Sequence, residues 1–117
     1  MSGFLKSFVY ALNGIIEAIK QRNIKIQLTI AIAAIALGFI FHINRGEWCI
    51  ILLCIALVLS LEITNTALEH LVDLVSPDYH EKAGKIKDLA AGAVLIASII
   101  SAIIGLIIFG KYLLSLL

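Results

Sequence analysis

Charged residues are scarce in this sequence, and their scarcity decides its broad class. Only 15% of the 117 residues are Asp, Glu, Lys or Arg, against roughly 25% in an ordinary soluble domain. In contrast, 62% are hydrophobic and the mean hydropathy is +1.08. A soluble chain this short needs polar residues to cover its surface, and disorder requires low hydrophobicity. A single proline and eight glycines also exclude collagen-like and linker-like chains, which leaves a small integral membrane protein of one domain.

Signals of several soluble function classes are also missing. The net charge of +1 leaves no dominant basic patch, so no nucleic-acid partner is expected. Cys49 and Cys54 lie on different sides of a helix within an apolar run, which argues against a disulfide or a metal pair. The segment from Gly105 to Lys111 matches the first seven positions of a phosphate-binding P-loop. However, Tyr112 stands where Ser or Thr is required and no strand precedes the segment, so we expect no P-loop site.

Three stretches without charged residues could cross a bilayer. They cover residues 26–44, 48–61 and 89–110. The first and third are long enough, because about 20 apolar residues span the hydrocarbon core as a helix. The second is too short unless its helix continues through Glu62 towards Asp73, which the absence of glycine or proline before Pro77 favours. We therefore expect one domain, 1–117, with transmembrane helices at about 25–43, 47–75 and 84–113.

The residues before the first span have the pattern of an amphipathic helix at about 4–22. Its apolar side carries Phe4, Leu5, Phe8, Val9, Leu12, Ile15, Ile16 and Ile19. Its polar side carries Lys6, Tyr10, Asn13, Glu17, Lys20 and Gln21. The polar residues fall within a sector of about 100°, so we expect this helix to lie in the membrane interface plane.

Basic residues predict the orientation of the chain. Four Lys or Arg residues precede the first span, and three lie between the second and third. One follows the first span and one follows the third. Because cytoplasmic loops carry the excess of basic residues, we expect a cytoplasmic N-terminus and a cytoplasmic loop at 76–87.

Small residues recur on the first and third spans. They are Ala34, Gly38, Ala91, Ser98, Ala102 and Gly105. Small faces let membrane helices approach closely, and three short helices leave little room for a closed site in one chain. Both points favour a homo-oligomer.

Polar residues form one stripe on the second span. Asn65, Glu69 and Asp73 follow Glu62 at +3, +7 and +11, which places all four on one side of a helix. Glu62 lies about 22 Å along the helix from Glu47, at 1.5 Å per residue. The stripe therefore runs from inside the membrane to its cytoplasmic surface, where ionisable residues are functional candidates.

Residues from the other helices are expected at the cytoplasmic end of this stripe. Lys87 and Asp88 lie at the entrance of the third span, and Glu17 and Gln21 lie on the surface helix. Carboxylates and amides bind Mg²⁺, a lysine binds phosphate, and a partly desolvated carboxylate can take a proton from an alcohol. These groups suit phosphoryl transfer from a nucleotide to a membrane alcohol. The alternative is a non-enzymatic pore or assembly subunit, in which the stripe only joins helices.

The polar stripe and the start of the third span also carry a resemblance. The run EITNTALEHLVD at 62–73, followed by KIKDLAAGAV at 85–94, closely resembles the prokaryotic diacylglycerol kinase family, which includes the undecaprenol kinases. The resemblance covers nearly the whole chain. It implies an all-α bundle of a surface helix and three transmembrane helices. It further implies a homotrimer in the bacterial inner membrane whose active sites are shared between subunits.

The resemblance also implies roles for individual residues. Glu62 would be the general base and would contact the lipid together with Asn65. Asn65 and Glu69 would bind the nucleotide, and Glu69 would also bind Mg²⁺. Lys87 would contact phosphate, and Asp88 would lie at the nucleotide site.

The sequence departs from the family before the first span. The family usually has a metal-binding glutamate there, whereas this chain has Gln21, followed by Arg22, Asn23 and Ile24. Either Gln21 supplies an uncharged oxygen, or Glu17, one turn earlier, supplies the carboxylate and contacts the nucleotide site.

The implied reaction is Mg²⁺-dependent transfer of the ATP γ-phosphate to a membrane lipid. Diacylglycerol, giving phosphatidic acid, is the expected acceptor, and undecaprenol, giving undecaprenyl phosphate, is the alternative. The segment at 22–26 is similar to the non-proteobacterial branch of the family, where undecaprenol is often the substrate. The apolar lipid-facing residues do not distinguish the two acceptors.

Overall fold

The computed structural model describes residues 2–117, and this part of the chain folds into four helices without a strand. The helices are α1 (Gly3–Ile19), α2 (Arg22–Ile40), α3 (Arg45–Val75) and α4 (Glu81–Ser115). The last three are each long and apolar enough to cross a membrane. The predicted all-helical fold with three candidate membrane spans is confirmed.

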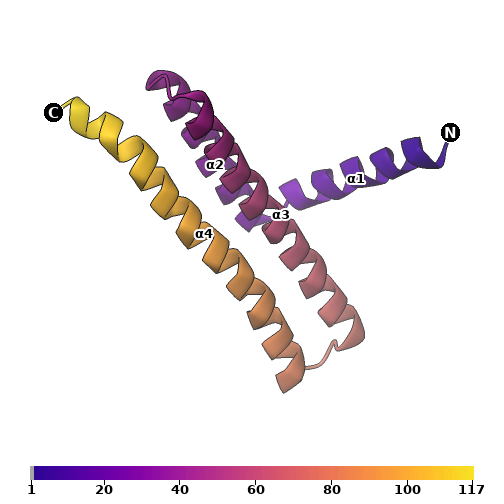
Figure 1. The fold of residues 1–117 in the computed structure, drawn as a ribbon. Coiled ribbons are helices and arrows are strands. Elements are labelled where there is room, and N and C mark those ends of the chain that lie inside the picture. The colour runs from indigo at the N-terminus through magenta and orange to yellow at the C-terminus, as the bar shows by residue number, and fades with distance from the viewer. Residues whose placement is uncertain (1) are drawn as a thin grey trace.

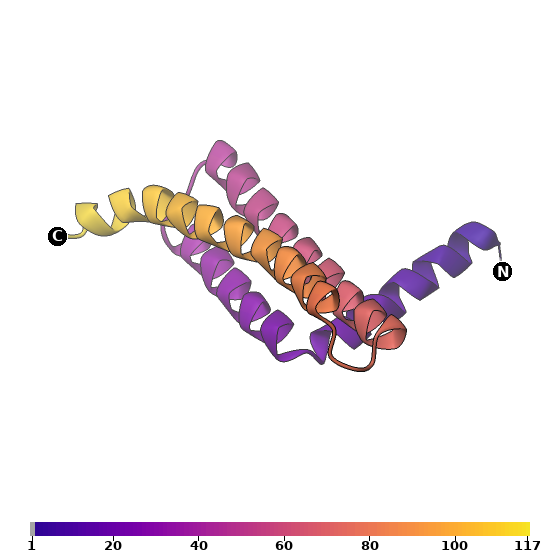
Figure 2. The same ribbon diagram turned by 90° about the horizontal axis from the view of Figure 1, so that it is seen from below.

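Helices α3 and α4 lie side by side and run antiparallel (Figure 1). Helix α2 packs against the first part of α3, and because it is shorter, the end of α3 and the start of α4 extend beyond it. Helix α1 leaves this bundle at an angle near the start of α2 (Figure 2). It contacts α2 and α3 at its C-terminal end, where Ala18 is buried. The apolar side chains of α1 are exposed, and its place on a membrane surface stays a prediction.

The break between α1 and α2 and the start of α4 differ from those predicted. Helix α1 ends at Ile19, about three residues before its expected end, and α2 begins at Arg22, about three residues before its expected start. Between them Gln21 has an extended backbone, with φ −76° and ψ 138°, and is the N-cap of α2. No glycine or proline marks this break, so hydrophobic periodicity could not locate it. Helix α4 begins at Glu81, because the His80 side chain accepts a backbone hydrogen bond in its first turn.

The turn between α2 and α3 is tight, and Gly38 allows it to close. The Ile43 N–H donates to the Gly38 carbonyl at 3.2 Å, and the His42 N–H donates to an α2 carbonyl at 3.4 Å. This pair of bonds is the Schellman pattern that ends helices, and His42 occupies its left-handed position with φ 50°. A Cβ added to Gly38 would lie 2.6 Å from the Trp48 ring. At Gly38, therefore, the small residue makes room for a contact within this chain.

Glu47 joins this turn to the end of α4. Its carboxylate accepts a hydrogen bond from the Tyr112 hydroxyl at 2.5 Å and pairs with the Lys111 ammonium at 2.6 Å. It also accepts the Asn44 backbone N–H at 3.1 Å, in a capping box at the start of α3. Lys111 and Tyr112, at the end of the rejected P-loop pattern, therefore fix how α3 and α4 align at this end.

Buried residues on α3 and α4 are mostly spaced three, four, seven or eleven positions apart. On α3 they are Glu47, Ile51, Val58, Glu62, Asn65 and Val72. On α4 they include Val94, Ala97 and Ile108. This spacing is that of helices packed along a seam, so two polar residues of the stripe lie within the bundle. Most other large apolar side chains face outward, as expected for helices surrounded by lipid.

Candidate active site

The polar stripe on α3 changes from buried to exposed along its length. Glu62 is 4% exposed and Asn65 is 6% exposed. One and two turns further on, Glu69 is half-buried and Asp73 is exposed. The stripe therefore connects the interior of the bundle with the end of α3 that extends beyond α2, as predicted.

Asn65 and Glu69 are joined directly. The Asn65 Nδ2 donates to Glu69 Oε1 at 3.1 Å, one turn along α3. This bond leaves the Asn65 Oδ1 buried and without a hydrogen-bond partner within residues 2–117. Buried polar atoms are nearly always satisfied, so this oxygen is a candidate ligand for a bound group.

Lys87 meets the outer end of the stripe. Its ammonium donates to Asp73 Oδ1 at 2.5 Å across the α3–α4 contact. Both side chains remain partly exposed, so the pair is accessible to solvent and contributes little to stability. The structure thus brings Lys87 to the predicted site, with Asp73 holding the position that a phosphate oxygen could take.

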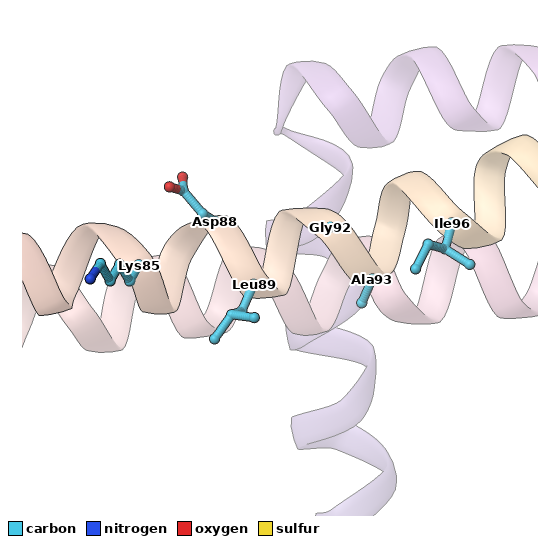
Figure 3. A pocket seen from close by; sticks show the side chains of 6 residues that line it. All are labelled: Lys85, Asp88, Leu89, Gly92, Ala93 and Ile96. Atoms are coloured by element: carbon cyan, nitrogen blue, oxygen red, sulfur yellow. The ribbon is translucent and has the colours of Figure 1, made fainter.

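Asp88 lies apart from the stripe within one chain. Together with Lys85, Leu89, Gly92 and Ile96, it lines a shallow hollow of about 650 Å³ along α4. Figure 3 shows its carboxylate pointing away from the α4 ribbon, on the side opposite Leu89. In the part of the chain that the structure describes, Asp88 has no ion pair with α3.

Glu17 and Gln21 do not share one helix, which corrects the expected geometry. Glu17 is in the last turn of α1, where it pairs with Lys20 at 3.2 Å and is exposed. Gln21 follows the break and is half-buried at the start of α2. The premise that both side chains project from adjacent turns of one polar face is therefore wrong, because the helix ends at Ile19.

The donor set fits a hard cation in part. Among residues 2–117, no group of three His, Cys, Asp or Glu residues is close enough to hold a metal ion. The free Asn65 Oδ1 and the Glu69 carboxylate nevertheless supply two oxygen donors one turn apart. Mg²⁺ is typically held by one or two carboxylates plus water and substrate phosphates, and this set is compatible with that mode.

Two features of the bundle were not predicted. In the sequence, Glu47 marks only the end of a span, and Ser98 is only one of the small residues of the third span. Glu47 and the Lys111–Tyr112 pair lie at one membrane level in the predicted topology, and that coincidence could have indicated their contact. The Ser98 hydroxyl oxygen is buried without a partner in the described chain, and no sequence signal indicates this.

Comparison with known proteins extends the likeness to whole chains. A sequence profile of the family described as prokaryotic diacylglycerol kinase matches residues 9–109, which include every predicted site residue. Undecaprenol kinase from Bacillus subtilis is 44% identical over 110 residues, covering 93% of this chain and 89% of that protein.

Two further relatives are named diacylglycerol kinase. The protein from Synechocystis is 43% identical over 103 residues, covering 86% of this chain and 59% of that protein. The protein from Escherichia coli K12 is 32% identical over 86 residues, covering 74% of this chain and 66% of that protein. Together with the profile match, these identities show that the chain belongs to the prokaryotic diacylglycerol kinase family.

Proposed function

We propose that this chain is an ATP-dependent kinase of a membrane lipid alcohol. The observation that carries the proposal is the burial of Glu62 on a stripe that reaches the exposed Asp73–Lys87 pair. In this proposal a lipid hydroxyl approaches Glu62 from the membrane side of the stripe, and a water-soluble nucleotide approaches from its exposed end. The alternative, polar residues that only join helices, requires the Glu62 carboxylate to find its partner on another chain, because it makes no side-chain hydrogen bond in residues 2–117.

The proposed reaction is a single displacement. The lipid hydroxyl oxygen forms a bond to the γ-phosphorus while the bond from phosphorus to the β–γ bridging oxygen breaks, and ADP leaves. The hydroxyl proton passes to the Glu62 carboxylate, so the products are a phosphorylated lipid, ADP and a protonated Glu62 that later releases its proton. Because phosphoryl transfer depends mainly on positioning and charge stabilisation, the protein needs little beyond a base and oriented phosphates.

Asn65 and Glu69 would hold Mg²⁺, together with either Gln21 or Glu17. When bound, the ion neutralises phosphate charge and orients the nucleotide. Lys87 would exchange Asp73 for a phosphate oxygen, which an exposed ion pair permits at small cost. Asp88 would bind the nucleotide from a neighbouring subunit. The scattered donors of one chain support a homo-oligomer, for which the family resemblance suggests a trimer.

We propose undecaprenol as the acceptor and diacylglycerol as the second candidate. The first is supported by the 44% identity to a protein named undecaprenol kinase over nearly the full length of both chains. The second is supported by the 43% identity to a protein named diacylglycerol kinase, although this chain spans only 59% of that relative. The sequence alone favoured diacylglycerol, and the extent of the matches reverses that order.

A side-by-side assay tests both levels of the proposal. Purified protein in mixed micelles receives ATP labelled in the γ-phosphate, with either undecaprenol or diacylglycerol, and with either Mg²⁺ or a chelator. We expect Mg²⁺-dependent label in the lipid fraction and a higher kcat/KM with undecaprenol. A higher kcat/KM with diacylglycerol would make diacylglycerol the preferred acceptor in place of undecaprenol. Absence of labelled lipid with both acceptors would reject the proposed kinase activity.

A further inference from the structure

Ser98 on α4 carries a buried hydroxyl that the mechanism has not used. Its oxygen is fully enclosed and has no hydrogen-bond partner within residues 2–117. Other helical hydroxyls in this chain, such as those of Thr29, Thr64 and Thr66, donate to the carbonyl four residues earlier. Ser98 does not make this local bond, so its hydroxyl is free to act between helices.

The alignment of α3 with α4 places Ser98 opposite Glu62. The Asp73–Lys87 contact fixes one register point. Eleven residues, or about three full turns, lead from Asp73 inward to Glu62 and from Lys87 inward to Ser98. Because three full turns return to the same side of each helix, Glu62 and Ser98 lie on the same sides of α3 and α4 as the outer pair.

The opposite end of the bundle gives nearly the same register. Glu47 bonds Tyr112 there, and fifteen residues inward on each helix lead to Glu62 and Ala97. Ala97 is 6% exposed and precedes Ser98. Two independent contacts therefore agree to within one residue that Glu62 lies level with this turn of α4.

The two groups are chemically complementary. Within the described residues, the Glu62 carboxylate accepts no hydrogen bond. The Thr66 hydroxyl does donate to Glu62, but to its backbone carbonyl and not to its side chain. A carboxylate accepts and a hydroxyl donates, and a bond with an ionised partner is among the stronger ones. The competing acceptor is the free Asn65 Oδ1, which lies one turn from Glu62 on α3.

We propose that Ser98 is a positioning residue, whose hydroxyl donates a hydrogen bond to Glu62 and orients its carboxylate towards the lipid hydroxyl. The proposal rests on the proposed function of Glu62 as the base. A general base must lie within hydrogen-bond reach of the proton that it takes, so a carboxylate held by Ser98 reacts more often than one that turns freely.

The test compares Ser98→Ala, Ser98→Thr and a matched control. We expect Ser98→Ala to lower kcat about tenfold and to leave the KM for ATP unchanged. Ser98→Thr keeps the hydroxyl and should retain kcat within about threefold. Ser101→Ala removes a hydroxyl one turn away, at the level of the apolar Val58, and should leave kcat unchanged.

A double-mutant cycle identifies the partner of Ser98. In a Glu62→Gln background, Ser98→Ala should have no further effect on kcat, because residues that act through one group are not additive. Coupling to Asn65→Ala instead of Glu62→Gln would overturn the proposal, as would a wild-type kcat for Ser98→Ala. If Glu62→Gln itself keeps wild-type kcat, the base assignment and this proposal both fail. If Glu62→Gln is inactive while Ser98→Ala is fully active, only this proposal fails.

Discussion

Two glutamates are buried on α3, and their surroundings differ. Glu47 has three partners, which are the Lys111 ammonium, the Tyr112 hydroxyl and a backbone N–H. Glu62 is more deeply buried and its carboxylate has no hydrogen bond within residues 2–117. Because a buried ionisable group is unfavourable unless it is paired, the partners of Glu47 explain its burial, whereas the burial of Glu62 has no such explanation within residues 2–117 and is consistent with the proposed role as base.

Replacing Glu62 with glutamine tests the assigned base. The Glu62→Gln side chain keeps the size of glutamate but cannot take the proton, so kcat should fall on the order of 10² or more with little change in the KM for ATP. Glu81→Gln is the control, because Glu81 is exposed and pairs only with Lys85 at 3.5 Å. Steady-state kinetics with purified protein measures both, and a kcat within threefold of wild type would remove Glu62 from the role.

Lys87 and Asp73 should respond differently to substitution. Lys87→Ala removes the proposed phosphate contact and should raise the KM for ATP about tenfold. Asp73→Asn frees the Lys87 ammonium from its present partner, so the KM for ATP should stay the same or fall. If both variants raise the KM equally, the ion pair itself is what the site needs, and the exchange of Asp73 for phosphate is wrong.

The residues of the site were partly predictable. The spacing of Glu62, Asn65 and Glu69 places them on one side of any helix, so the stripe followed from the sequence alone. The Lys87–Asp73 contact and the unpartnered oxygens of Asn65 and Ser98 depend on how α3 and α4 align. That alignment is set by contacts at both ends of the bundle, which periodicity within one helix does not contain.

At the scale of whole elements, the number of helices was easier to predict than their ends. Long apolar runs indicate the three spans, because bilayer thickness fixes the length that a helix needs. The break at Lys20–Gln21 has no glycine or proline to mark it. The turn after α2 places His42 where glycine is common, so neither boundary had a distinct sequence signal.

Gly38 is expected to be intolerant of any side chain. In Gly38→Ala the new Cβ would meet the Trp48 ring at 2.6 Å, and the tight turn between α2 and α3 would have to open. We expect a loss of about 1–3 kcal/mol in the free energy of unfolding. The control is Gly105→Ala, where the Cβ would have open space. Unfolding by denaturing detergent measures both, and equal stability of the two variants would contradict this packing.

The junction of α1 and α2 bears on which residue would take the place of the metal-binding glutamate that the family resemblance implies. The Gly38–Trp48 contact fixes the alignment of α2 with α3. Counting seventeen residues back from Gly38 along α2 leads to Gln21, and counting seventeen residues forward from Trp48 along α3 leads to Asn65. Gln21 therefore lies at the level of the proposed metal donors, whereas Glu17 is exposed and paired with Lys20. Of the two residues, the geometry favours Gln21.

Gln21→Glu adds an anionic oxygen at that level and should lower the Mg²⁺ concentration needed for half-maximal activity, because carboxylates are the preferred ligands. Glu17→Ala should leave the Mg²⁺ titration unchanged. If Glu17→Ala instead abolishes most activity and the added Gln21→Glu restores it, Glu17 is the ligand. If the single and double variants all titrate like wild type, this junction supplies no metal ligand.

At the scale of the whole molecule, shape and charge agree on one orientation. Helix α1 leaves the bundle where α2 begins, and the ends of α3 and α4 continue past that level (Figures 1 and 2). If α1 lies on the membrane surface, those ends project into the aqueous phase beside it. The basic residues of the first 25 positions and of the α3–α4 region lie on this same side. This side carries the exposed end of the polar stripe, so the proposed function requires it to face the compartment that holds ATP.

Cysteine labelling in sealed cells tests this orientation. The native Cys49 and Cys54 are first replaced by serine, because Cys49 is exposed, and single cysteines are then introduced as Asp78→Cys and Arg45→Cys. Seven of the nine basic residues lie on the side of residue 78 and two lie on the side of residue 45. Because the excess of basic residues marks the cytoplasmic side, a membrane-impermeant maleimide should label position 45 from outside. It should label position 78 only after the cells are permeabilised, which also shows that position 78 is reactive. Labelling of position 78 in sealed cells would show that the topology is the reverse of the one predicted. The exposed end of the stripe would then lie on the side without ATP, and the proposed kinase function would fail as well.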